Sequence, residues 1–149
     1  MSHTSKISAI TIVDIHALRA ACRELKEKQG VNLSIEENVT PRAYFSDQQG
    51  MGVAPYVIKL HDCRYDVGLY QTADKRGYEA RADLFAGYIA GQLGETARQG
   101  EDRDMAQMGK LFKLYAVHAT MRTAVAQGHV PQRIDKSNGD IQVVLNLAA

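Results

Sequence analysis

Hydrophobic and polar residues alternate along several stretches of the chain, which is the pattern of half-buried β-strands. The first three such stretches are residues 5–12 ("SKISAITI"), 31–39 ("VNLSIEENV") and 56–63 ("YVIKLHDC"). Prolines and glycines interrupt the alternation over residues 40–55. We therefore expect a long loop there, with a short strand near residues 42–45.

Two more alternating runs form the segment "YDVGLYQTADKRGYEARADLF", residues 65–85, and a polar turn, "TADKRG", joins them. This arrangement predicts a β-hairpin. Tyrosine, valine, leucine and alanine occupy one side of the alternation. The other side carries Asp66 and Tyr70 on the first strand, then Glu79, Arg81 and Asp83 on the second. Antiparallel sheets commonly leave one face in solvent, so this charged row is either a wet sheet face or a site.

Helical spacing of apolar residues predicts three helices. The first follows Asp14, a good N-cap, and ends at Gly30. The second covers residues 83–97 in spite of its glycines, and the third covers residues 105–129. The inner stripe expected for the third helix is Met108, Leu111, Phe112, Tyr115, Ala119, Arg122 and Val125.

The chain closes with a second hairpin around "SNGD", residues 137–140. Asn-Gly favours a type I′ turn, because both residues tolerate positive φ. The whole pattern predicts a single α+β domain, residues 1–149, with a mostly antiparallel sheet covered on one side by two or three helices and a C-terminal β-hairpin.

Composition narrows the functional classes. The chain has 149 residues and a formal net charge of +1, so we do not expect a nucleic-acid partner. It has two cysteines, Cys22 and Cys63, and no signal peptide or long apolar run. We therefore expect a cytoplasmic protein that does not associate with a membrane.

Three stretches together are similar to a known family. The chain opens with "MSHTSKI", carries "YDVGLYQTADKRGYEARADLF" in the middle, and ends with "LFKLYAVHATMRTAVAQG" and "SNGDIQVVLNL". This order resembles the family of conserved plastid open reading frame thirty-five, a domain of unknown function from cyanobacteria, red-algal plastids, other bacteria and phages. The matching hairpin positions are Tyr65, Asp66, Gly68, Tyr78, Glu79, Ala82 and Asp83.

The resemblance spans nearly the whole chain and implies association with an ATPase of the AAA type. It brings no established activity. Family members usually have tryptophan after the Ala-Asp pair, where this chain has Leu84 and Phe85. A pocket shared with the family at that position is therefore in doubt.

A second candidate site is the helical row Tyr115, His118 and Arg122, which lie on one side of the third helix. Such a row could hold an anion, with Arg122 as a fork for phosphate or carboxylate, or it could form the rim of a core. His61 and Cys63 point the same way on a strand but are only two ligands, so we expect no metal site.

Our leading hypothesis is a non-enzymatic binding or accessory module that recognises a protein partner or a small anionic ligand, without a cofactor. Its concave side would combine the hairpin face with the row on the third helix. The residues expected to bind are Arg42, Tyr44, Asp66, Tyr70, Glu79, Arg81, Asp83, Tyr115, His118 and Arg122.

Two alternatives remain open. One is an enzyme for an anionic substrate, with His118 as general acid–base beside Glu79 or Asp83. The other is an oligomeric structural protein, or a phage-encoded protein that inhibits or sequesters a host molecule. In the oligomeric protein, the apolar strand Val143 to Leu147 could extend the sheet of another chain.

Overall fold

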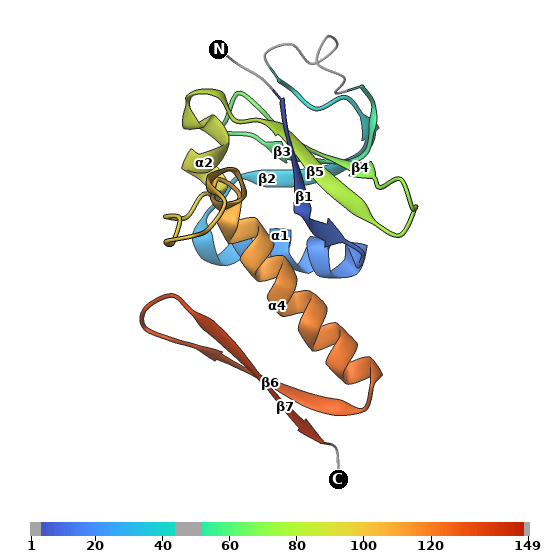
Figure 1. The fold of residues 1–149 in the computed structure, drawn as a ribbon, viewed down its shortest axis with the longest axis vertical. Coiled ribbons are helices and arrows are strands. Elements are labelled where there is room, and N and C mark those ends of the chain that lie inside the picture. Colours follow the sequence, from blue (N-terminus) through green and yellow to red (C-terminus); the bar gives the residue numbers. More distant parts are fainter. Residues whose placement is uncertain (1–3, 44–51, 148–149) are drawn as a thin grey trace.

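A five-stranded antiparallel sheet forms the body of the molecule (Figure 1). The computed structural model describes residues 4–43 and 52–147. The strands lie in the order β1-β5-β4-β3-β2. Their bounds are β1 Thr4–Ile12, β2 Leu33–Val39, β3 Ala54–Leu60, β4 Val67–Gln71 and β5 Tyr78–Asp83. The predicted antiparallel sheet and single α+β domain are confirmed.

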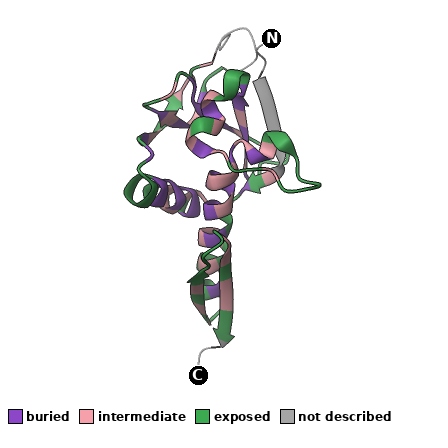
Figure 2. Cartoon of the chain, turned by 90° about the vertical axis from the view of Figure 1, so that its left-hand side faces the viewer, coloured by how far each residue is buried: buried purple, intermediate pink, exposed green. Residues whose placement is uncertain are grey.

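The helices pack against one face of this sheet. Their bounds are α1 Ile15–Gln29, η1 Phe85–Gly87 (a 3-10 turn), α2 Tyr88–Leu93, α3 Arg103–Ala106 and α4 Gly109–Ala126. Buried side chains of α1, α2 and α4 join one face of β2–β5 in a single hydrophobic core (Figure 2). Leu18, Leu25, Ile58, Leu69 and Leu111 are fully buried in it. Among the described residues, no helix has both the length and the apolar composition needed to cross a membrane.

The first helix forms as its capping residues predict. The Asp14 carboxylate accepts hydrogen bonds from the backbone N–H of His16 and Ala17. Gly30 ends the helix with a φ of 70°, in the left-handed region that glycine reaches without steric cost. Residues next to the helix in the sequence therefore mark both ends of α1.

The other two predicted helices are shorter than expected. The segment 83–97 forms only η1 and α2, because Ala86 and Gly87 adopt positive φ and break the helix. Residues 105–129 were expected as one helix, but α3 and α4 are separated at Gln107–Met108. The end of α4 passes beyond the core, so Val125, expected inside, is 62 % exposed.

The C-terminal hairpin is a separate two-stranded sheet, β6 His129–Asp135 and β7 Ile141–Leu147. It forms a narrow stalk below the body of the molecule (Figure 2). The hairpin is confirmed, but the type I′ turn is wrong. A type I′ turn needs positive φ at both central residues, but of Asn138 and Gly139 only Gly139 has it. The backbone N–H of Lys136 donates to the carbonyl of Asp140, and the five residues 136–140 connect the two strands.

Candidate functional site

The register of the sheet separates the two predicted sites. Leu69 lies opposite Ala80, and both belong to the core on the helix side. The adjacent pairs, Tyr70 with Glu79 and Gly68 with Arg81, therefore project from the opposite face, since side chains alternate along a strand. We call this second surface, with Lys59 and Glu36, the polar face.

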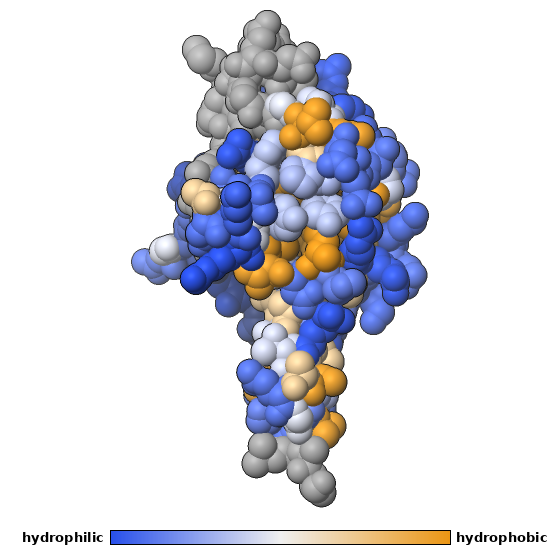
Figure 3. All heavy atoms as spheres, turned by 90° about the vertical axis from the view of Figure 1, so that its right-hand side faces the viewer, coloured by the Kyte–Doolittle hydropathy of each residue, from blue (hydrophilic) through white to orange (hydrophobic). Residues whose placement is uncertain are grey.

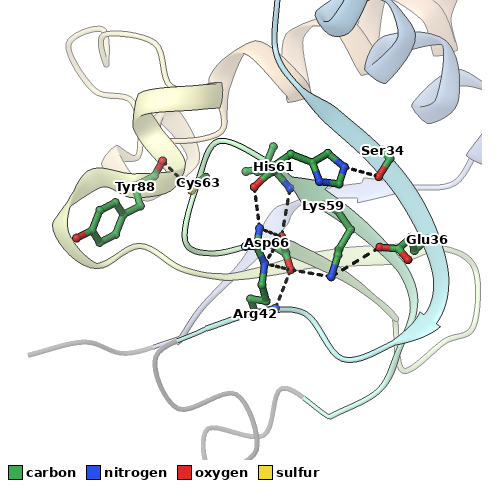
Figure 4. Close-up of polar contacts among 9 residues, drawn as sticks. Ser34, Glu36, Arg42, Lys59, His61, Cys63, Asp66 and Tyr88 are labelled. Carbon is green, nitrogen blue, oxygen red and sulfur yellow. Dashed lines mark hydrogen bonds and ion pairs between the residues drawn. The ribbon is translucent and has the colours of Figure 1, made fainter.

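Asp66 is the most buried charged group of the polar face, with no exposed surface. Its carboxylate lies between Arg42 and Lys59 (Figure 4). One of its oxygens accepts from the backbone N–H of Arg42 at 2.9 Å, and both accept from the Arg42 guanidinium at 2.8–3.2 Å. The backbone N–H of Leu60 donates at 3.2 Å, and Lys59 Nζ lies 3.8 Å away. The carboxylate is thus saturated by its own chain and fastens residues 41–43 to β3 and β4.

Beside this pair, Arg81 lies over the ring of Tyr70, with 4.5 Å between the guanidinium carbon and the ring centroid. The same guanidinium donates to Glu79 at 3.0 Å. Burial raises the pKa of Tyr70, whose hydroxyl donates to the carbonyl of Gly52. Tyr70, Glu79 and Arg81 are therefore brought together as the sequence predicts, but as a packed stack.

Asp83, at the end of β5, has a local role. It is buried, and its carboxylate accepts from the backbone N–H of Phe85 at 3.0 Å. This contact starts the turn into η1. Tyr44, the remaining residue predicted on this side, lies outside the described residues.

The row on α4 lies on the other side of the sheet. The Tyr115 hydroxyl accepts from the backbone N–H of Val13 at 2.9 Å and of Asp14 at 3.1 Å. Arg122 donates to the Asp14 carboxylate at 2.8 Å, which helps to lower the pKa of Asp14. These residues hold α4 against the start of α1. The prediction that the hairpin face and this row line one common hollow is wrong, because the sheet lies between them.

His118 is also remote from the carboxylates proposed to act with it. Its Nε2 lies 2.9 Å from Glu24 of α1, not beside Glu79 or Asp83. Arg133 of β6 donates to both oxygens of Glu24, at 2.7 and 2.8 Å. Contacts with Arg133 and His118 lower the pKa of Glu24 to about 2, and hydrogen bonds to Glu24 and Asp135 raise the pKa of Arg133. The acid–base arrangement with Glu79 or Asp83 is therefore not present.

His61 and Cys63 follow β3 rather than lying on it, so they do not share a strand face. His61 Nε2 lies 2.8 Å from the Ser34 hydroxyl, whereas the Cys63 thiol donates to the carbonyl of Tyr88 (Figure 4). Over residues 4–43 and 52–147, no three His, Cys, Asp or Glu side chains come together in a way that could hold a metal ion.

A cavity lies elsewhere in the described part of the chain, between α4, the tip of the β6–β7 hairpin and the connection from α2 to α3. It has a volume of about 650 Å³, within the usual range of ligand sites. We call it the tip cleft. Its apolar floor is formed by Ile10, Met105, Ala106, Phe112, Ala116 and Ile141, and its rim by Glu95, Thr96, Arg98, Glu101, Lys113, Lys136, Asp140 and Gln142.

The rim of the tip cleft is electrically balanced. Arg98 pairs with Asp140 at the hairpin tip, and this contact lowers the pKa of the Asp140 carboxyl. Lys113 of α4 lies 3.3 Å from Glu95. The two pairs tie the hairpin tip and residues 95–98 to the cleft walls, and they neutralise the charges that surround its apolar floor.

The sequence contained little sign of this cleft. Residues 98–104 read only as a charged break, and 137–140 only as a turn. Its walls meet because Ile10 leaves the sheet in a bulge of β1, where Ile7 pairs with Ala80 but Ile12 pairs with Tyr78. Neither the bulge nor the position of the hairpin tip has a local signal.

The chain matches no protein-family model, no curated protein and no solved structure. The resemblance to the plastid reading-frame family therefore stays a prediction.

Proposed function

We propose that the protein is a non-enzymatic binding module, and that the tip cleft receives an apolar-sided segment of a partner protein. The observation that carries this proposal is the shape and chemistry of the cleft, an apolar floor of about 650 Å³ inside a rim of charged residues. Protein interfaces commonly combine an apolar centre with a polar rim that stays in solvent.

Charge pairing favours a protein segment over a small anion. Each arginine that the sequence suggested as an anion ligand already forms an ion pair within the chain: Arg42 with Asp66, Arg81 with Glu79, and Arg122 with Asp14. On the rim of the cleft, Arg98 is paired with Asp140 and Lys113 with Glu95. An anion would have to compete with these internal carboxylates, whereas apolar side chains would only displace water from the floor.

The resemblance described above suggests a class of partner, an ATPase of the AAA type. Nothing in the proposal depends on that class, because the cleft would accept any segment with apolar side chains on one side. The same chemistry would serve a phage-encoded inhibitor of a host protein.

Filling the cleft with a long side chain tests the proposal. Ala116 is exposed on α4 and lines the cleft, so Ala116→Arg should block it with little cost to the helix. Ala126→Arg is the matched control, because Ala126 is exposed on the same helix and does not line the cleft. We expect wild type and Ala126→Arg, purified from the source cells, to retain a protein that Ala116→Arg loses.

Quantitative mass spectrometry of the purified material would identify the protein, and titration calorimetry would then measure at least a tenfold loss of affinity for Ala116→Arg. If all three chains retain the same proteins equally, the cleft is not the binding site. If native mass spectrometry shows that the displaced species is a small molecule, the small-ligand hypothesis replaces this one.

A further inference from the structure

The last strand of the chain has an unusual composition for a strand at the edge of a sheet. β7, "IQVVLNL", contains no charged residue and no proline over Ile141–Leu147. Exposed edge strands present unpaired backbone N–H and C=O groups, and natural proteins commonly protect them with charges, prolines or bulges. Within the described residues, β7 pairs only with β6.

The neighbouring strand carries the protection that β7 lacks. β6, "HVPQRID", contains Pro131, which cannot donate a ladder hydrogen bond, and the charged residues Arg133 and Asp135. Arg133 is held by Glu24, so β6 is also the strand tied to the body. The two edges of the hairpin therefore differ: the β6 edge resists further pairing and the β7 edge does not.

The outward face of the hairpin adds to this asymmetry. Arg133 and its neighbour Val143 face the body, so the alternate residues Val130, Gln132, Ile134, Val144 and Asn146 lie on the other face of the hairpin. None of these five side chains is charged. Val130 is 55 % exposed and Ile134 is 37 % exposed. Figure 3 shows apolar residues among polar ones along the narrow stalk. A two-stranded hairpin alone is marginal in water, so additional strands would stabilise it.

We propose that β7 pairs antiparallel with β7 of a second copy of this chain, about a two-fold axis that passes beside Val144. The two hairpins then form one four-stranded sheet, β6-β7-β7-β6, in which Ile141 of one copy lies opposite Leu147 of the other. This inference does not depend on the proposed partner of the tip cleft, although β7 contributes Ile141 and Gln142 to the lining of that cleft.

The absence of charge makes β7 compatible with a copy of itself, which favours a second copy of this chain as the occupant. Antiparallel pairing about a two-fold axis centred on Val144 places that residue opposite itself and its neighbours opposite one another. Like charges directly opposite each other are destabilising, so such pairing requires a strand without charges. β7 meets this requirement along its whole length, and β6 does not. Because seven residues bury little area, we expect dissociation constants in the micromolar range.

Sedimentation velocity over a concentration series tests the proposal on the full chain. We expect wild type to shift from 16.4 kDa to twice that mass as its concentration rises to several hundred micromolar. Val144→Lys places two ammonium groups at the seam and should remain a single chain. Gln132→Lys is the matched control: Gln132 lies opposite Val144 on the outward face, but on the strand away from the seam. It should dimerise as wild type does.

Mixing complementary variants separates the interface from the folding of the hairpin. Val144→Lys and Val144→Glu should each be monomeric alone, and an equimolar mixture should regain the double mass. In wild type, amide hydrogen exchange in β7 should slow as concentration rises. A wild type that stays at the mass of one chain, or a mixture that does not pair, would overturn the proposal. Equal dissociation by Gln132→Lys would instead assign the contact to the outward face and contradict the edge pairing.

Discussion

Glu24 connects three elements of the chain through one side chain. It belongs to α1, lies 2.9 Å from His118 Nε2 of α4, and accepts two hydrogen bonds from Arg133 of β6. A carboxylate with a guanidinium fork is held in its ionised form, which is why its pKa is lowered to about 2. The residue is an attachment point between the body and the hairpin rather than an acid–base catalyst.

This pairing gives the stability of the protein a defined pH dependence. The pKa of Glu24 is about 2 in the folded state and near its ordinary 4.5 in the unfolded state. The ion pair therefore contributes fully above about pH 4.5, and its contribution is lost as the pH falls toward 2. Across this window we expect wild type to lose about 2 kcal/mol more than Glu24→Gln, allowing for solvent screening of the pair.

Urea unfolding at a series of pH values between 2 and 5 measures this difference. The other carboxylates titrate in both proteins, so their effect cancels when the two curves are subtracted. Parallel curves for wild type and Glu24→Gln would show that the ion pair contributes nothing to stability.

Strand β4 shows how one glycine allows several large groups to pack. A Cβ at Gly68 would lie 2.7 Å from Tyr70 Cε2 and 3.0 Å from Pro41 Cγ. Glycine leaves room for the Tyr70 ring under Arg81, and for Pro41, which the Asp66–Arg42 contact places over the strand. Packing therefore explains why this position has no side chain.

Replacing this glycine should disturb the polar face of the sheet. Gly68→Ala should destabilise the protein by about 1–3 kcal/mol, since the added methyl forces the Tyr70 ring or Pro41 to move. Gly91→Ala is the control: it lies in α2, has open space around it, and should be neutral or stabilising by about 0.5–1 kcal/mol. Thermal unfolding of both variants would measure the opposite signs. A stable Gly68→Ala would mean that the polar face is loosely packed.

Local sequence patterns predict most of the helices and strands but few of the contacts by which they pack together. Alternation predicts the hairpin from Tyr65 to Phe85, and capping predicts α1, because both depend on neighbours in the chain. The Glu24–Arg133 pair joins residues 109 positions apart. No local pattern indicates that contact, the side of the sheet that α4 covers, or the β1 bulge that brings Ile10 to the tip cleft. For this reason the sequence could not indicate that the sheet separates the hairpin face from the row on α4.

On the scale of the whole molecule, the structure consists of a body and a stalk joined by few polar contacts. The packing of α4 on β6, the Arg133–Glu24 pair and the Arg98–Asp140 pair at the tip hold the hairpin in place. Local unfolding free energies follow the number and burial of such contacts. The hairpin should therefore open independently of the five-stranded sheet.

Removing its main attachment tests this view. Arg133→Met should raise amide hydrogen-exchange rates in β6 and β7 by about tenfold or more, equivalent to ~1.4 kcal/mol, and leave those of β3–β5 unchanged. Arg122→Met removes a more exposed ion pair, made through one hydrogen bond between α4 and Asp14, that does not involve the hairpin, so it should not change exchange there. Equal acceleration throughout the chain would show that body and stalk unfold as one unit.

The position of β1 has a consequence for synthesis on the ribosome. Within the described residues, β1 pairs only with β5, in a register that joins Thr4 to Asp83. Strands β2 to β5 pair with their neighbours in chain order, whereas the segment "TSKISAITI" has no partner strand in the sheet until residue 83 has left the exit tunnel. While the intervening strands are being made, the nascent chain therefore carries an unpaired aliphatic strand, to which a chaperone would bind.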